Sequence, residues 1–182
     1  TEEIFCAKVH STLKESHKNI LTIIVPRHVN RTKNIFDELN KTNLKISLYS
    51  NFKEMEDDTD ILLVDTYGET TKFYQISKCV FLGKSLIKSL KNNSGQNPIE
   101  ASRLGCKIYH GPNVTNFAEI YSYLKSLGIS FEIETYEKLS HHLTEELKET
   151  KAIDINIVQK IENFGITILN NVLDEIKIYI NK

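Results

Sequence analysis

The sequence lacks the features of a secreted or membrane-spanning protein. Its 182 residues include only three cysteines, Cys6, Cys79 and Cys106, which form no CxxC pair, so we expect reduced thiols rather than disulfides or a zinc site. The longest largely apolar stretch, ILTIIV, has about a third of the ~20 residues that a membrane-spanning helix needs, and no signal-peptide pattern is present. These absences predict a soluble chain in a reducing, cytosolic environment.

An excess of positive charge is also missing. The chain has 23 basic and 24 acidic residues, so its overall field does not favour nucleic acid or an anionic membrane surface. With 40% hydrophobic residues, the length suits one domain, or one domain with a helical appendage. The chain begins TEEIFCAKVH, without an initiator Met and already in helical rhythm, which suggests a piece of a longer protein.

The signatures of three common enzyme classes are absent as well. Neither the dinucleotide-binding GxGxxG nor the P-loop GxxxxGK[ST] occurs, and no Ser or Cys lies in a nucleophile elbow. The sequence therefore disfavours a dehydrogenase, a P-loop nucleotide hydrolase and an α/β-hydrolase.

What the sequence does contain is a regular alternation of short β-branched runs and helical patterns. Such alternation is typical of βαβ units with right-handed crossovers, and hence of a mostly parallel sheet covered by helices on both faces. Strands are expected at residues 19–26, 45–50, 61–65, 79–83, 106–111 and 130–134, and helices at 2–16, 30–43, 69–77, 97–105 and 116–128.

We therefore predict an α/β fold, with a Rossmann-like three-layer domain over residues 1–152. Residues 153–182 are expected to be C-terminal helices of the same domain, with a recurring apolar stripe and a break at Gly165. The polar segment from Lys88 to Gln96 is expected to be a loop.

Candidate binding residues follow the predicted strands. Because ligands of open α/β sheets bind outside the carboxyl ends of the strands, the residues just after each strand are the first candidates. We expect four such segments to lie along one edge, namely Pro26-Arg27-His28, Asp65-Thr66-Tyr67-Gly68-Glu69, Asn97-Pro98-Ile99-Glu100 and Gly111-Pro112-Asn113.

Taken singly, these residues also allow plain structural interpretations. Arg27 suits a phosphate or a carboxylate, but equally a surface ion pair. Gly68 and Gly111 fit ordinary turns, and Glu69 fits a cap of the next helix.

The histidines point to structure rather than to catalysis. His28 and His110 lie at predicted strand ends, where a hydrogen-bonded structural histidine is more typical than a base. His141 and His142 are adjacent on a predicted surface helix, so they point in different directions and are not expected to share a metal.

Glu100 has two interpretations. Asn97 suits an N-cap, Pro98 the first helical position and Glu100 the third, where its carboxylate can bond back to the backbone N–H of the cap. The same helix start also offers free backbone N–H groups and the positive end of a helix dipole to an anion.

The order of the motifs is more informative than any one of them. The chain reads VPRH, DTYGE, FLGKSL, GQNPIE and GPNVTNFAEI between about Ile23 and Leu127. This series resembles the C-terminal half of 3-deoxy-D-manno-octulosonic acid (Kdo) transferases, with the approximate pattern VPRHPER, DTMGE, FVGGSL, GGHNPLE and GPHTFNF. The resemblance implies a GT-B glycosyltransferase of two Rossmann-like domains, of which this chain is the C-terminal, CMP-Kdo-binding one.

The resemblance also implies which residues bind the donor. In the family the CMP site is formed by the Pro-Arg pair, the Met-Gly-Glu tripeptide and the Asn-Pro-Leu-Glu segment. A nucleoside monophosphate carries one phosphate, so one arginine and a helix start suffice where a pyrophosphate would need a glycine loop. We expect Arg27 and backbone amides near Asn97 to meet the phosphate and Glu100 to accept hydrogen bonds from ribose hydroxyls. The corresponding residues here are Pro26, Arg27, Tyr67, Gly68, Glu69, Asn97, Pro98, Ile99 and Glu100.

Three positions depart from the family pattern. Tyr67 replaces the Met, Lys84 replaces the second glycine of GGS, and Gln96 replaces the histidine before Asn-Pro. Gln96 can donate a hydrogen bond but cannot take up a proton, so an acid-base role of that histidine is lost.

The remaining functional expectations concern the whole enzyme. The family's proposed base is a glutamate of the N-terminal domain, so this fragment should bind the donor but not catalyse, and no catalytic residue, cofactor or metal is expected in it. The resemblance implies an inverting transfer of Kdo to a lipid A precursor at the cytoplasmic face of the bacterial inner membrane. The acceptor and the membrane are expected to contact parts not in this sequence, and the terminal helices to cross back to the absent N-terminal domain.

Two other functions remain open from the residues. Another GT-B transferase, using a UDP- or GDP-sugar, would also place a glutamate at this helix start. A non-catalytic α/β interaction module would keep the fold and lose the donor. Binding of CMP in preference to UDP separates the first from a Kdo transferase, because a bound ligand stabilises the fold according to its occupancy.

Overall fold

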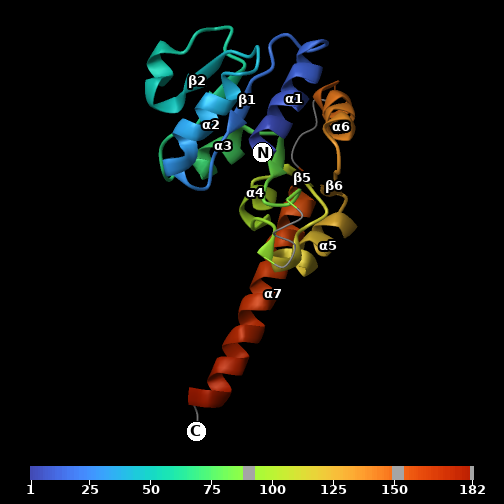
Figure 1. Ribbon diagram of the computed structural model, residues 1–182. Coiled ribbons are helices and arrows are strands. Elements are labelled where there is room, and N and C mark those ends of the chain that lie inside the picture. The colour runs from blue at the N-terminus through green and yellow to red at the C-terminus, as the bar shows by residue number, and fades with distance from the viewer. Residues whose placement is uncertain (88–92, 149–153, 181–182) are drawn as a thin grey trace.

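The computed structural model describes residues 1–87, 93–148 and 154–180, and it is an α/β structure (Figure 1). Its strands are β1 (Thr22–Ile24), β2 (Ile46–Leu48), β3 (Ile61–Leu63), β4 (Cys79–Leu82), β5 (Lys107–His110) and β6 (Ser130–Glu132). Its α-helices are α1 (Glu2–Lys14), α2 (Thr32–Leu39), α3 (Thr70–Ile76), α4 (Ile99–Arg103), α5 (Ala118–Ser126), α6 (Tyr136–Lys148) and α7 (Ile155–Ile180), with short 3-10 turns η1 (Val29–Arg31), η2 (Tyr49–Glu54) and η4 (Thr115–Phe117).

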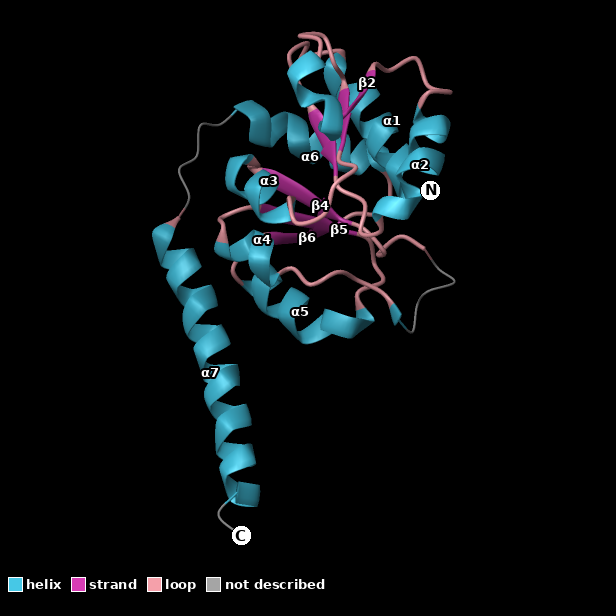
Figure 2. Ribbon diagram, turned by 90° about the vertical axis from the view of Figure 1, so that its left-hand side faces the viewer, coloured by secondary structure: helices cyan, strands magenta, loops and turns pink. Residues whose placement is uncertain are grey.

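All strand pairs of the described residues are parallel, which confirms the predicted βαβ organisation. The strands form two sheets, in the orders β1-β3-β2 and β4-β5-β6. Ile23 lies opposite Leu62 in the first sheet, and Tyr109 lies opposite Phe81 and Phe131 in the second. Figure 2 shows the strands of the two sheets running in clearly different directions, so the layer is divided rather than continuous.

Helix α1 packs against both sheets. Ala7 belongs to the core of the first sheet, where Ile61 and Leu63 are fully buried. Val9 and Leu13 belong to a second cluster with Tyr109, from β5. Helix α1 thus buries apolar side chains against both groups of strands, and Figure 1 shows its N-terminal end between the two sheets.

The glycines after two helices end them as expected. Gly105 and Gly128 follow α4 and α5 with φ angles of 80° and 73°. This left-handed region is open to glycine because it carries no Cβ, so both residues serve as C-terminal stops.

The break predicted at Gly165 is wrong, because α7 continues through it from Ile155 to Ile180. One interior glycine costs a helix only about 1 kcal/mol, and neighbouring side chains supply compensating contacts. Phe164 stacks on Tyr123 of α5 with ring centroids 4.1 Å apart, and Ile161 is buried. The predicted domain boundary at residues 152–153 and most of the predicted loop from Lys88 lie outside the described residues.

Beyond Gly165, α7 leaves the rest of the molecule as a long extension (Figure 1). Its large apolar side chains are exposed there, and they include Ile166, Ile168, Leu169, Val172, Leu173, Ile176, Ile178 and Tyr179. Among the helices of the described residues, none is long and apolar enough to cross a membrane.

Candidate functional site

The predicted binding segments follow β1, β3 and β5 and precede α4, at the carboxyl ends of the parallel strands. Parallel pairing places the segments after β1 and β3 at one edge of the first sheet, whereas the segments after β4 and β5 lie at an edge of the second sheet. The single edge that we predicted for all four segments is therefore divided between two sheets. The first segment is open to solvent, because the side chains of Arg27 and His28 are exposed. Within the described part of the chain no carboxylate pairs with Arg27, whereas nearby Arg31 donates to Glu3 over 3.1 Å. Among these described residues, the surface ion pair considered for Arg27 does not form.

The segment after β3 is a structured turn. Ser50 donates to the Asp65 carboxylate through its backbone N–H at 2.8 Å and through its hydroxyl at 2.6 Å. Gly68 has a φ angle of 82°, so the chain reverses at a position that favours glycine. Tyr67 stands on this turn with its side chain 72% exposed, which leaves its ring available to a ligand.

Glu69 lies at the N-cap position of α3, but its side chain makes no capping hydrogen bond. Its carboxylate instead lies 2.7 Å from the ammonium of Lys72, and this hydrogen bond raises the lysine pKa. It also accepts from the hydroxyl of Tyr49 at 3.5 Å. The expected helix cap is thus replaced by contacts that fix the carboxylate beside the turn.

Helix α4 starts one residue later than predicted, with Pro98 rather than Asn97 at the N-cap position and without a side-chain capping bond from that residue. Asn97 precedes the cap, and its Oδ1 accepts from the backbone N–H of Ile99 at 3.0 Å. The positions predicted for Asn97 and Pro98 are thus wrong by one residue, and the Asn97 side chain occupies one of the amides expected to meet a phosphate. Pro98 is buried, while the side chains of Asn97 and Glu100 are exposed. The asparagine and the glutamate are therefore the side chains of this segment that face solvent.

Glu100 bonds differently from the predicted capping box. Its Oε1 accepts a hydrogen bond from the hydroxyl of Thr71, near the start of α3. The hydrogen bond links the first turn of α3, which follows DTYGE directly, to the NPIE segment, although Thr71 and Glu100 are 29 residues apart in the sequence. One oxygen of the carboxylate is oriented by Thr71, and the other is left for a further donor.

The turn after β5 is tied to the turn after β4. The buried hydroxyl of Ser85 accepts from the backbone N–H of Gly111 at 2.8 Å, and its carbonyl accepts from the backbone N–H and side-chain amide of Asn113 at 2.9 and 3.0 Å. The plain turn expected at Gly111 is present, but its role is to close against Ser85. Sequence reasoning did not single out Ser85, because nothing local marks a serine that is buried by a segment 26 residues away.

His110 is a structural histidine as predicted, whereas His28 is exposed and its ring makes no hydrogen bond within the described part of the chain. His110 is buried, its Nδ1 lies 2.6 Å from the carbonyl of Gly111, and its ring packs on Tyr121. Burial lowers its pKa, so the ring is neutral at pH 7. His141 and His142 are exposed on α6. In the described ranges no group of three or more His, Cys, Asp or Glu side chains is arranged to hold a metal ion.

The three cysteine thiols have raised pKa values. Burial raises the pKa of Cys6 to about 12 and the pKa values of Cys79 and Cys106 to about 11. The thiols are therefore protonated at neutral pH and are poor nucleophiles.

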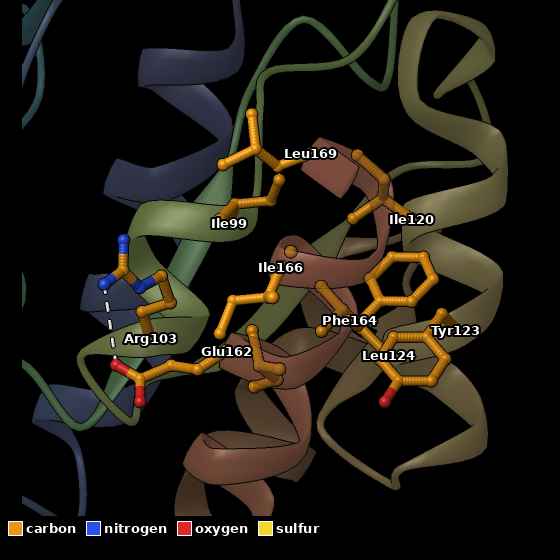
Figure 3. Close-up of a pocket in the computed structure, with 11 residues that line it drawn as sticks. Ile99, Arg103, Ile120, Tyr123, Leu124, Glu162, Phe164, Ile166 and Leu169 are labelled. Atoms are coloured by element: carbon orange, nitrogen blue, oxygen red, sulfur yellow. Dashed lines mark hydrogen bonds and ion pairs between the residues drawn. The ribbon is translucent and has the colours of Figure 1, made fainter. Parts of the chain in front are cut away.

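An apolar pocket of about 480 Å³ lies on another face, between α4, α5 and α7 (Figure 3). Ile99 and Leu169 point into it from opposite helices, and the Arg103–Glu162 ion pair lies at its rim. The side chain of Ile99, which we expected to contact the donor, thus lines this pocket. Its shape and apolar lining suit helix packing rather than a nucleotide.

No protein-family model matches the chain. Individual proteins do match. The chain is 35% identical over 120 residues to a probable 3-deoxy-D-manno-octulosonic acid transferase, mitochondrial, from Arabidopsis thaliana, covering 65% of the chain and 26% of that protein. It is 28% identical over 150 residues to the 3-deoxy-D-manno-octulosonic acid transferase of Haemophilus influenzae, covering 82% of the chain and 34% of that protein. The chain thus spans about a third or less of the length of these relatives.

The fold matches a solved structure over most of its length. The C-terminal CMP-Kdo binding domain of WaaA from Acinetobacter baumannii superposes with a TM-score of 0.76 at 23% identity, covering 89% of this chain and 82% of that domain. The sequence matches confirm the resemblance to Kdo transferases that the motifs predicted. The structural match confirms the predicted α/β fold.

Proposed function

We propose that this chain is the donor-binding domain of a Kdo transferase, and that it holds CMP-Kdo for transfer of Kdo to a lipid A precursor. The observation that carries the proposal is the contact between Thr71 and Glu100, which ties the first turn of α3, directly after DTYGE, to the NPIE segment. The similarity in sequence to Kdo transferases over most of the chain supports it independently.

The exposed groups at this edge match the chemistry of CMP. A guanidinium recognises a phosphate by charge and by its fork of donors, and Arg27 is exposed and unpaired among the described residues. A carboxylate accepts hydrogen bonds from vicinal ribose hydroxyls, and Glu100 is exposed with one oxygen oriented by Thr71. The exposed ring of Tyr67 offers a flat apolar surface to the base.

In this proposal the domain binds and positions the donor, and the transfer is completed by the rest of the enzyme. In an inverting transfer, an acceptor hydroxyl attacks the anomeric carbon while the bond to the CMP phosphate breaks. Arg27 then stabilises the charge that grows on the leaving phosphate. The base that removes the hydroxyl proton belongs to a part of the enzyme that this chain does not cover, so the chain alone should show no turnover.

The exposed half of α7 fits the same proposal. Eight large apolar side chains beyond Gly165 are exposed, and a helix with such a face is stabilised by packing against another surface. We assign α7 to the same domain as the strands, with its outer half crossing to the N-terminal domain. Contact with the lipid acceptor and with the cytoplasmic face of the inner membrane would also belong to that part.

Titration of CMP, UDP and GDP into the 182-residue chain, followed by calorimetry, tests the donor. We expect CMP to bind most tightly, and Glu100→Gln to weaken CMP about tenfold or more because charge-assisted hydrogen bonds to the ribose are lost. Glu119→Gln, on the exposed face of α5, is the matched control and should bind CMP as the wild type does. Preference for UDP or GDP would indicate another GT-B transferase, and no nucleotide binding would indicate an interaction module.

A further inference from the structure

The carboxylate of Glu2 lies in a ring of three consecutive backbone amides. Its Oε1 accepts from the N–H groups of Ser85 at 2.9 Å and Leu86 at 2.8 Å, and its Oε2 accepts from the N–H of Lys84. Lys84 has a φ angle of 58°, the left-handed conformation that turns successive amides toward one point. Such a nest of amides is a strong binding site for an anion, here supplied by the first residue of α1.

The turn has been shaped around this carboxylate. A Cβ on Gly83 would lie 2.9 Å from the Glu2 Oε2, so a side chain there would push the carboxylate out. The unfavourable backbone of Lys84 is sustained by the same contact, because three charge-assisted hydrogen bonds outweigh the cost of one left-handed lysine. Glu2 therefore fixes the conformation of the turn after β4.

The turn after β4 also fixes the position of the segment that precedes α4. The carbonyl of Lys84 accepts from the backbone N–H of Gly95 at 2.8 Å, two residues before Asn97. Ser85 closes on the turn after β5, where a Cβ on Gly111 would lie 2.4 Å from the Ser85 carbonyl oxygen. Gly111 and Ser85 are packed so closely that neither can move alone. A displacement of Lys84 and Ser85 would therefore also displace the turn after β5 and the segment that leads into α4.

The neighbouring Glu3 contacts the residues after β1 rather than the turn after β4. Its carboxylate lies 3.1 Å from the guanidinium of Arg31, in the η1 turn that follows Arg27. The first turn of α1 thus contacts both the segment after β1 and the segment after β4. Of the two contacts, that of Glu2 is the more enclosed, since its three donors are backbone groups, whereas the Arg31 side chain is half exposed.

We propose that Glu2 is a positioning residue of the donor site, which holds the segment Gly95–Glu100 in its binding conformation through the amide nest of residues 84–86. This inference rests on the proposed CMP site. Glu2 does not touch the ligand. It acts through the Lys84–Gly95 hydrogen bond on the residues that do.

The test compares Glu2→Ala with Glu3→Ala in the 182-residue chain, under conditions where urea unfolding shows both to be folded. We expect Glu2→Ala to weaken CMP binding about tenfold, because an ordered segment becomes mobile, and Glu3→Ala to change it less than about twofold, because an exposed pair contributes little. Hydrogen exchange of the amides of residues 84–86 and 94–100 should accelerate in Glu2→Ala and not in Glu3→Ala.

Chemical rescue separates positioning from a general loss of stability. Formate should occupy the vacated nest of Glu2→Ala and restore CMP affinity, while sodium chloride at the same ionic strength should not. Should Glu2→Ala fail to fold, Glu2→Gln keeps one acceptor oxygen for Ser85 and Leu86 and is expected to lose only part of the affinity.

Equal CMP affinity of wild type and Glu2→Ala, or faster exchange spread over the whole chain, would overturn the inference. If the wild type binds no CMP, the donor proposal fails. The exchange of residues 94–100 then still decides whether Glu2 orders that segment, since this measurement needs no ligand.

Discussion

The hydroxyl of Thr71 donates a hydrogen bond to the carboxylate of Glu100, and so links the first turn of α3 to α4. Each residue alone has a modest local role, one as a surface threonine and one as a helix-start glutamate. Together they set two candidate donor-binding segments at a fixed spacing. Among the described residues, no other donor orients the second oxygen of Glu100.

Replacing Thr71 by Val should weaken CMP binding about fivefold, since one hydrogen bond contributes ~1 kcal/mol and the carboxylate then samples other rotamers. Calorimetric titration of CMP measures the effect. Thr167→Val is a suitable control, because Thr167 donates to the carbonyl of Asn163 within α7, away from the site. If Thr71→Val binds CMP as tightly as Thr167→Val, Thr71 does not orient Glu100 for the ligand.

A second prediction concerns Gly165, the residue at which the sequence pattern had indicated a break. An added Cβ would have no heavy atom within 4 Å, and the backbone there is helical. Gly165→Ala should therefore raise the free energy of unfolding by about 0.5–1 kcal/mol, through the lower entropy of the unfolded chain. Urea unfolding followed by circular dichroism measures the change.

The control for this prediction is Gly128→Ala. Its added Cβ would also meet nothing within 4 Å, but its φ angle is 73°. Alanine in that left-handed conformation is expected to cost about 1 kcal/mol. If Gly165→Ala raises the free energy of unfolding and Gly128→Ala lowers it, both changes result from backbone conformation, because neither added Cβ meets another atom. A loss of stability in Gly165→Ala would contradict the continuous helix.

The order of strands and helices was predictable because hydrophobic periodicity is local. Runs such as ILLVD and CVFLG have the composition of buried strands wherever they lie, and the residues after them must lie at the strand exits. The helix start near Asn97 was predictable to within one residue for the same reason, since the Asn97 side chain bonds to Ile99, two residues away.

Contacts between distant segments could not be predicted in this way. The carboxylate of Glu2 meets backbone amides more than eighty residues later, and a backbone amide carries no sequence signature. Glu100 looked like half of a capping box because its actual partner, Thr71, lies on another helix. The division of the strands into two sheets likewise depends on where α1 packs, which is a property of the assembled core.

His10 provides the third prediction. Its ring is fully buried, with Nδ1 2.9 Å from the Thr22 hydroxyl and Nε2 3.2 Å from the Asp60 carboxylate. Burial lowers the pKa of His10 below 6.5, although Asp60 opposes the shift. The Asp60 carboxylate also pairs with Lys14 and accepts from the backbone N–H of Lys45, so it keeps its charge without a proton on the histidine.

The low pKa of His10 in the folded chain determines how the free energy of unfolding changes with pH. As the pH falls through 6.5, the unfolded chain binds a proton at His10 while the folded chain does not, so the unfolded state is favoured. The stability that His10 contributes is thus fully present above pH 6.5 and is lost as the pH falls toward its lowered folded pKa. Urea unfolding at pH 7.5 and pH 5.5 should show this loss in the wild type.

The variant His10→Gln should be less stable at pH 7.5, because glutamine cannot satisfy Thr22 and Asp60 in the same geometry, and its stability should depend less on pH between the two values. The exposed His141→Gln is the control and should keep the slope of the wild type. If His10→Gln does not fold, an NMR titration of the wild-type His10 ring measures its pKa in the folded chain directly. A ring that protonates at or above pH 6.5 in the folded chain would contradict the prediction, because burial would then not be the dominant influence on its pKa.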